Sequence, residues 1–312
     1  MITALAGGVG AARLLRGLVR IVPRTEVTAV VNTGDDTVLH GLTICPDLDT
    51  VTYTLAGMND DERGWGLAGE TWTAMEALER LGGESWFRLG DKDLATHLYR
   101  TQRLADGAPL SEVTREITAA VGIGARLLPM SDDPVRTRLT LVDGPEIAFQ
   151  EYFVRRQHSV AVASVRFAGA DTCRAAPGVL DALADGDVIV ICPSNPVVSI
   201  GPLLAVPGIA DALRQRRSRV VAVSPIVAGA ALKGPADRLM AELGVAPTVV
   251  GVAQMYAEVA GTLVIDDADA ALADDVEALG LDCIVAPTVM KSVADAERLS
   301  TTVLDAVSGR MA

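Results

Sequence analysis

Lysine is nearly absent from this chain of 312 residues, in which Lys92, Lys233 and Lys291 are the only lysines and arginine supplies every other fixed cation. Cations as a whole are outnumbered, because 40 Asp and Glu residues stand against 27 Lys and Arg, which gives a net charge of -13 at pH 7. Nonspecific binding of nucleic acid needs a basic surface that neutralises phosphates. We therefore expect no nucleic-acid partner, and we expect any anionic ligand to be held by local donors.

Cysteines are few and long apolar runs are missing. Cys45, Cys173, Cys192 and Cys283 form no CxxC pair, which argues against a zinc site or a disulfide framework. No uninterrupted apolar stretch reaches membrane-spanning length, and no basic segment precedes an apolar one at the amino terminus, so neither insertion nor export is indicated. These absences predict a cytoplasmic protein with reduced thiols and no membrane partner.

Half of the residues are hydrophobic, which is enough for a large core in one domain or in two unequal ones. Strand-like and helix-like segments alternate over most of the chain, and this alternation predicts an α/β fold with a doubly wound, mostly parallel, Rossmann-like sheet. The predicted strands lie at residues 2–6, 27–31, 160–167, 187–192, 219–223, 248–251, 262–265 and 283–286.

The pattern differs between residues 50 and 150. Amphipathic helices are predicted at 71–81, 94–104 and 110–121, and alternating segments at 137–142 and 146–153 predict a small β-hairpin. We expect a nucleotide-binding α/β domain made of residues 1–50 and 137–312. Residues 51–136 would form an inserted helical subdomain over one end of the sheet.

The first strand runs directly into a glycine-rich turn. Gly7, Gly8 and Gly10 follow the apolar segment 2–6 and precede an apolar helix pattern, an arrangement in which backbone amides can approach phosphate oxygens closely. The alternative is a glycine turn that merely packs the helix on the strand. The segment therefore predicts a phosphate site at the start of the first helix, with that structural alternative open.

This turn departs from two familiar phosphate-binding templates. A dinucleotide fingerprint counted from Gly8 would have its third glycine at position 13, where the chain has Arg13, and the second strand ends in Asn32 instead of an acid that binds ribose. The lysine and hydroxyl residue that end a Walker A loop are also missing. A nicotinamide-dependent oxidoreductase is accordingly a weaker alternative.

Four acids lie close to the predicted strand ends, Asp35 and Asp36 after the second strand and Asp47 and Asp49 before a helix. Carboxylates grouped beside a phosphate turn suit Mg²⁺, which takes one or two carboxylates together with phosphate oxygens. Each acid could instead cap a helix or close an Asx-turn. Asp49 would also suit a general base.

Other polar clusters predict the remaining sides of a site. Trp86 could stack on a flat ring while Arg88 fixes its polar edge, although core packing is the alternative for Trp86. Ser194 and Asn195 offer donors at a helix start, where simple capping is the alternative. Lys233 stands at a predicted helix amino end, where a cation is unfavourable unless an anion joins it.

These motifs, in this order along nearly the whole chain, resemble the 2-phospho-L-lactate transferase family, and especially its actinobacterial branch, the phosphoenolpyruvate transferases of coenzyme F-420 biosynthesis. Enzymes of this family join a guanosine diphosphate-linked three-carbon acid, lactyl or enolpyruvyl, to the deazaflavin Fo. They release GMP, require Mg²⁺ and are commonly homodimers. The resemblance thus implies a transferase with Fo and a guanosine-linked donor as its partners, and it leaves open which acid the donor carries.

The resemblance also implies roles for individual residues. Asp49, Asp35 and Asp36 would be catalytic, with Asp49 and Asp35 holding the metal. The deazaflavin pocket would contain Asp49, Trp86, Arg88, Ser131 and Asp132. The nucleotide would be bound by Gly7, Gly8, Gly10, Ser194, Asn195, Lys233 and Gly234.

One competing interpretation belongs to another functional class. A sister family of similar fold binds UDP-sugars and regulates cell-envelope growth without being an enzyme. Its glycine turn typically carries an extra glycine and a threonine where this chain has Gly7 to Gly10, and the segments around Trp86 and Ser131 favour the transferase.

Overall fold

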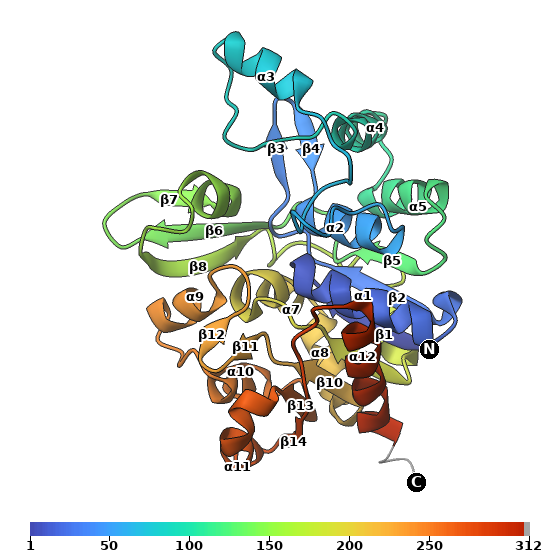
Figure 1. Ribbon diagram of the computed structural model, residues 1–312, viewed down its shortest axis with the longest axis vertical. Helices are drawn as coiled ribbons and strands as arrows, with labels where there is room; N and C mark the ends of the chain where they lie inside the picture. Colours follow the sequence, from blue (N-terminus) through green and yellow to red (C-terminus); the bar gives the residue numbers. More distant parts are fainter. Residues whose placement is uncertain (309–312) are drawn as a thin grey trace.

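The computed structural model describes residues 1–308, and its centre is a seven-stranded sheet in which all strand pairs are parallel (Figure 1). The strand order is β14-β13-β10-β9-β1-β2-β5. The strands are β1 (Ile2–Ala6), β2 (Val27–Val31), β5 (Arg126–Pro129), β9 (Val188–Ile191), β10 (Val220–Val223), β13 (Thr262–Ile265) and β14 (Asp282–Val285). The order changes direction between β1 and β9, and the carboxyl ends of strands at such a point form the crevice where open α/β sheets bind ligands.

Helices cover both faces of this sheet, so the predicted doubly wound α/β architecture is confirmed. One face carries α1 (Gly8–Ile21), α2 (Pro46–Leu55), α5 (Leu110–Ala120) and α12 (Val293–Ser308). The other face carries α6 (Val179–Asp185), α7 (Gly201–Ala205), α8 (Ile209–Gln215), α9 (Ala236–Glu242), α10 (Val249–Tyr256) and α11 (Ala273–Glu277). Because the central strands are buried on both faces, they read in the sequence as continuous apolar runs.

Short turns and ribbons complete the fold. Three turns are 3₁₀-helical, at Arg24–Glu26, Arg217–Arg219 and Asp267–Leu272, and two are π-helical, at Glu151–Arg155 and Pro196–Ile200. Two-stranded ribbons are formed by β3 (Thr37–Leu39) with β4 (Leu42–Ile44) and by β11 (Ile226–Val227) with β12 (Ala230–Ala231).

The predicted helices of the central region are present as α3 (Thr73–Arg80), α4 (Asp93–Ala105) and α5. Figure 1 shows α3 at one end of the molecule, beyond the β3–β4 ribbon, and α4 beside that ribbon. A small apolar cluster of Ile44, Met75 and Leu89 joins the ribbon to this end. Residues 51–136, the predicted helical subdomain, also include β5, which pairs with β2 at the edge of the main sheet. The division at residues 51–136 stays a prediction.

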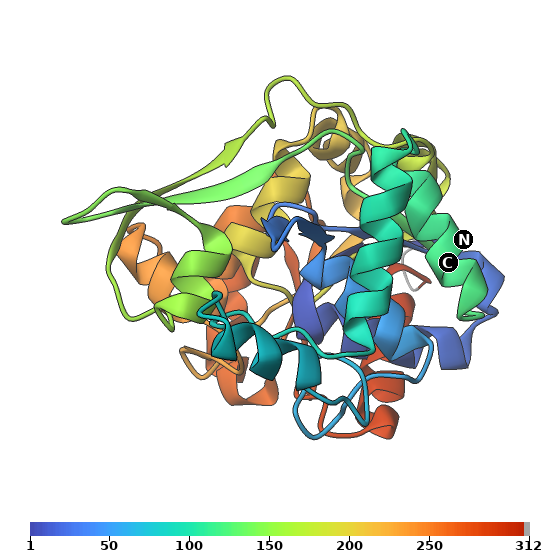
Figure 2. The ribbon, with the colours of Figure 1, turned by 90° about the horizontal axis from the view of Figure 1, so that it is seen from above.

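An antiparallel arm projects from the body (Figure 2) and contains β6 (Arg136–Leu141), β7 (Glu146–Ala148) and β8 (Val162–Ala168). The predicted hairpin is confirmed as β6 and β7, but its second strand ends at Ala148 and the chain then enters a π-helical turn. The assignment of residues 160–167 to the parallel sheet is wrong, since β8 pairs antiparallel with β6. Much of β8 is exposed, whereas a strand inside a parallel sheet is buried on both faces.

The strand predicted at 248–251 is also wrong, because these residues begin α10. The Thr248 hydroxyl caps that helix by accepting a hydrogen bond from the Gly251 N–H at 3.2 Å. A short apolar run cannot be assigned to strand or helix by periodicity alone, and here the cap decides it.

Among residues 1–308, no single helix is both long enough and apolar enough to cross a membrane. Only the pair Pro196–Ala205 and Ile209–Gln215, bent by 90° at its break, meets the length and composition of a span.

Candidate active site

The glycine turn after β1 lies against the turn after β9, because β1 and β9 are neighbouring parallel strands of the sheet. The Gly7 N–H donates to the Ser194 hydroxyl at 3.3 Å. A Cβ on Gly10 would lie 2.1 Å from the Pro193 carbonyl oxygen, so only glycine allows this contact. Gly7, Gly10 and Ser194, three predicted nucleotide-binding residues, are therefore brought together, and the close packing also accounts for the glycines.

Asp47 connects the glycine turn to the acidic cluster. Its carboxylate accepts a hydrogen bond at 2.9 Å from the Asn32 side-chain amide and lies against the glycine turn, since a Cβ on Gly7 would be 2.9 Å from Asp47 Oδ2. Gly8 has φ +70°, a left-handed conformation that glycine adopts without strain. Burial raises the pKa of Asp47 to about 6, although the hydrogen bond from Asn32 and the nearby Gly8 N–H act in the opposite direction. The first residues of α1 and of α2 thus share one buried polar site.

Asp35 and Asp36 lie next to Asp47 at the end of β2, and both carboxyls are buried. Burial raises the pKa of Asp35 well above its ordinary range, and the charges of Asp47 and Asp36 add to the effect. Burial likewise raises the pKa of Asp36 to about 7, against the nearby charge of Arg136. At neutral pH this cluster can therefore hold either a proton or a cation.

One oxygen of Asp36 is unused. Its Oδ2 accepts a hydrogen bond from the Cys45 thiol at 3.1 Å, whereas its buried Oδ1 has no hydrogen-bond partner among the described residues. A cavity of about 210 Å³ beside it is also lined by Asp35, Arg136 and Gln150. A carboxylate oxygen held in this way is available to a ligand or cation.

Asp49 lies in the first turn of α2 and is fixed by α4. Both of its carboxylate oxygens accept hydrogen bonds from the Arg100 guanidinium, one of them at 3.1 Å. The side chains of Asp49 and Arg100 are only 8% and 3% exposed, so this is a buried, bidentate ion pair. His97 Nδ1 lies 3.7 Å from Asp49 Oδ2, and the site therefore continues along α4.

Asp93 and His97 complete this second cluster. His97 Nε2 is 3.2 Å from Asp93 Oδ2, and the Tyr53 hydroxyl donates to Asp93 Oδ1 at 2.5 Å. The nearby His97 and the hydrogen bond from Tyr53 lower the pKa of Asp93, although burial opposes them. Three ligand atoms, one each from Asp49, Asp93 and His97, lie within 4.8 Å of one another, and this spacing fits a metal ion.

The donor set agrees with this geometry. His97 Nε2 is buried without a properly directed hydrogen bond from the described residues, as a metal-ligating nitrogen would be. Of the two predicted metal ligands, Asp49 belongs to the group of three and Asp35 does not. Asp35 is engaged instead by the side-chain amides of Asn32 and Gln150, at 3.3 and 3.4 Å.

The residues predicted for the deazaflavin pocket are spread over two regions. Trp86 is half-buried and contacts Phe87 edge to face, while Arg88 is exposed, with its guanidinium 4.5 Å from the ring centre of Trp72. Ser131 donates to the Arg174 carbonyl at 2.6 Å. Asp132 accepts hydrogen bonds from the backbone N–H and the hydroxyl of Ser111 in α5. In this structure the polar groups of Ser131 and Asp132 are thus used within the fold.

The predicted nucleotide residues beyond the glycine turn also differ in their surroundings. Asn195 accepts hydrogen bonds from Val197 N–H and Val198 N–H, so its carbonyl caps the π-helical turn Pro196–Ile200. Lys233 and Gly234 lie in the exposed loop before α9. A Cβ on Gly64 would lie 2.4 Å from Lys233 Nζ, so the ammonium rests against the backbone of the loop at 57–69.

Comparison with known proteins shows the family to which this chain belongs. A family model described as 2-phospho-L-lactate transferase CofD matches residues 2–294. The chain belongs to this family. It is 46% identical over 309 residues to a phosphoenolpyruvate transferase of Kitasatospora aureofaciens, covering 97% of this chain and 96% of that one. It is 48% identical over 299 residues to a phosphoenolpyruvate transferase of Streptomyces griseus subsp. griseus, covering 94% and 93%.

Membership in the CofD family confirms the prediction of a transferase. Among solved structures, the chain is similar to a UPF0052 family protein of Bacillus halodurans, with a TM-score of 0.63 and coverage of 97% and 98%. The sequences of that pair are only 18% identical, so this likeness shows the fold alone.

Among the residues of these clusters, Asp47 was predicted only as one of four acids suited to Mg²⁺, and three others were not predicted, namely Asp93, His97 and Arg100. A local signal for the last three exists in the sequence, since positions 93, 97 and 100 follow helical spacing and so lie on one face of α4. Nothing in that spacing indicates that the face is turned toward Asp49.

Proposed function

We propose that this chain transfers a phosphoenolpyruvyl group from a guanosine diphosphate-linked donor to the ribityl hydroxyl of the deazaflavin Fo, with release of GMP, in coenzyme F-420 biosynthesis. The family supports the transfer of a phospho-three-carbon acid, and the names of the relatives support phosphoenolpyruvate as that acid. The observation that carries it is the position of Asp47, whose Oδ2 lies against Gly7 and also accepts a hydrogen bond from Asn32, so the glycine turn is continuous with the buried carboxylates. The 2-phospholactyl donor is the alternative within the same family.

In the proposed reaction the terminal ribityl hydroxyl attacks the phosphorus that carries the three-carbon acid. The bond from this phosphorus to the GMP oxygen breaks, GMP leaves with the electron pair, and the hydroxyl loses its proton. Catalysis of such a transfer consists mainly of positioning and charge neutralisation. The glycine turn with Ser194 and Lys233 would hold the nucleotide phosphates, and Arg88 would orient the acceptor.

We infer a metal at Asp49, with Asp93 and His97 as its closest possible partners. Mg²⁺ held there by the carboxylate oxygens of Asp49 and Asp93 would neutralise charge on the phosphate groups, whereas the His97 nitrogen suits a softer divalent metal than Mg²⁺. Arg100 keeps the Asp49 carboxylate in one orientation through its bidentate contact, so we favour a ligand role for Asp49 over a role as general base. Asp35 stays a predicted ligand, and Asp36, with its unpaired oxygen, is a second candidate.

The proposal is tested by thermal stability with Mg²⁺ and, separately, GDP, UDP-N-acetylglucosamine and NAD, followed by the best nucleotide with Fo added. A ligand at 100 times its dissociation constant adds about 2.7 kcal/mol to the free energy of unfolding. A shift with GDP that grows with Fo would support the transferase, and GMP release from each donor would then identify the acid. A shift with the UDP-sugar alone would favour the sister family's regulatory role and contradict our assignments.

A further inference from the structure

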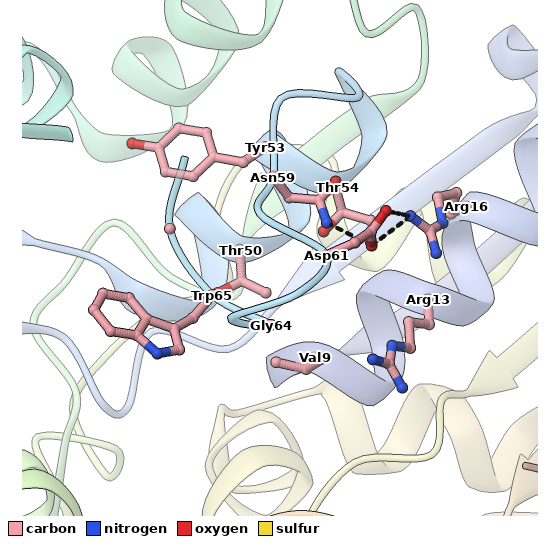
Figure 3. Close-up of a pocket in the computed structure, with 11 residues that line it drawn as sticks. Val9, Arg13, Arg16, Thr50, Tyr53, Thr54, Asn59, Asp61, Gly64 and Trp65 are labelled. Atoms are coloured by element: carbon pink, nitrogen blue, oxygen red, sulfur yellow. Dashed lines mark hydrogen bonds and ion pairs between the residues drawn. The ribbon is translucent and has the colours of Figure 1, made fainter. Parts of the chain in front are cut away.

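A small pocket opens beside the first turn of α1, between α1, α2 and the loop at residues 57–69 (Figure 3). Val9, which belongs to the glycine turn, forms one wall, and Trp65 of the loop forms another. The pocket is therefore continuous with the turn at which the nucleotide phosphates are proposed to bind. Its free volume is only about 20 Å³, so a small planar group such as a carboxylate could reach its mouth, whereas a larger group could not enter.

The charges in this pocket are unbalanced. Both Arg13 and Arg16 line it, but the only acid in its lining is Asp61. Arg16 is neutralised because one of its guanidinium nitrogens donates to both oxygens of Asp61, at 2.9 and 3.1 Å (Figure 3). Arg13 is half-buried. Among the described residues, its guanidinium donates a hydrogen bond only to the Met290 carbonyl, at 3.3 Å. The charge of Arg13 also acts on Asp61, but among the described residues no carboxylate lies within ion-pair distance of its guanidinium.

The position of Arg13 in the helix suits an anion next to the phosphates. Val9 and Arg13 are four residues apart in α1 and share one face, and one helical turn advances about 5.4 Å. At the position of Arg13, dinucleotide-binding proteins carry a glycine that lets the helix pack closely. In this chain the close glycine contact of α1 is made with another helix, since a Cβ on Gly17 would lie 2.4 Å from the Ala296 carbonyl oxygen in α12. Position 13 instead carries a long cationic side chain that lines the pocket.

We propose that Arg13 binds the carboxylate of the three-carbon acid on the donor and so selects donors that carry an acid. The identity of this donor rests on the proposed function. In a 2-phospho three-carbon acid, the carboxylate and the phosphate oxygen are attached to the same carbon, so the carboxylate stays close to the phosphate. The planar guanidinium can pair with it through two parallel hydrogen bonds, which a lysine could not do.

The test compares phosphoenolpyruvate with inorganic phosphate, each titrated calorimetrically into protein that contains Mg²⁺ and saturating GMP. We expect the wild-type protein to bind phosphoenolpyruvate more tightly than phosphate by roughly 10- to 100-fold, the range for hydrogen bonds to charged groups. Arg13→Gln should remove this preference while its affinities for phosphate and GDP stay unchanged. Arg13→Lys should keep part of it.

Arg20→Gln is the matched control, because Arg20 lies on the same helix but is exposed and pairs with Glu297. An unchanged preference in Arg13→Gln, a wild-type protein without any preference, or an equal loss in Arg20→Gln would each overturn the inference. If Arg13→Gln does not fold, the partial loss expected in Arg13→Lys is decisive. Failure of the wild-type protein to release GMP with Fo, with the preference intact, would refute the proposed function and not the role of Arg13.

Discussion

Replacing Asp49 with Asn removes the negative charge that faces Arg100 in the interior. Both side chains are nearly inaccessible, and Arg100 would keep its charge without its direct carboxylate partner, with Asp93 and Asp36 as the remaining nearby acids. Breaking a buried ion pair by removing one partner costs about 3 to 5 kcal/mol. Because Asn still offers a carbonyl oxygen, we expect about 3 kcal/mol, and at roughly 2 to 4 °C per kcal/mol the melting temperature should fall by about 6 to 12 °C.

A second substitution separates this structural effect from the proposed chemistry. Arg100→Met fills most of the volume of the arginine side chain without a charge. The double variant Asp49→Asn/Arg100→Met should therefore recover at least half of the decrease in melting temperature that Asp49→Asn causes. Its transfer activity should stay at least about 100-fold below that of the wild-type protein, because the charged carboxylate at the reacting centre is still missing.

The assay is GMP release from the guanosine-linked donor with Fo, measured well below the melting temperatures of all three proteins. A single variant that melts within a degree of the wild-type protein would refute the energetic argument for the buried pair. A double variant that recovers turnover would refute the role of Asp49 in the reaction.

Gly10→Ala should destabilise the fold by about 1 to 3 kcal/mol in urea denaturation, because the added Cβ would meet the Pro193 carbonyl oxygen, and an unchanged stability would contradict that contact. Asp91 accepts hydrogen bonds from the Thr71 hydroxyl and from N–H groups at the start of α3, which lower its pKa to about 2. Its stabilising contribution should be complete above about pH 4, near its ordinary pKa of 3.8, and be lost as the pH falls through about 2. In Asp91→Asn the acid limb of stability against pH should be shallower, and an identical limb would count against this assignment. Lys233→Gln should weaken GDP binding by roughly 10-fold at low salt without changing the melting temperature; equal affinity for GDP would remove Lys233 from the nucleotide site.

Those parts of the fold that follow from local pattern could be predicted from the sequence. The apolar strands β1, β2 and β9, the glycine turn and the amphipathic helices α3 to α5 all have signals within a few residues. Prediction failed where the signal was ambiguous, as at residues 248–251, where Thr248 turns a short apolar run into a helix. It also failed for β8, because the choice of partner strand depends on β6 and not on β8's own residues.

By itself, the sequence determined the residue types of the candidate site. These are glycines after β1, acids after β2 and at the start of α2, and Arg13 at the position where a dinucleotide-binding fold has a glycine. Only the tertiary structure decided which of them meet. Asp49 and Arg100 are 51 positions apart, and their pairing depends on how α4 lies against α2. Gly7 and Ser194 are 187 positions apart and meet because β1 and β9 are neighbours in the sheet. Side-chain chemistry is local to the sequence, whereas contact across such separations depends on the packing of the whole chain.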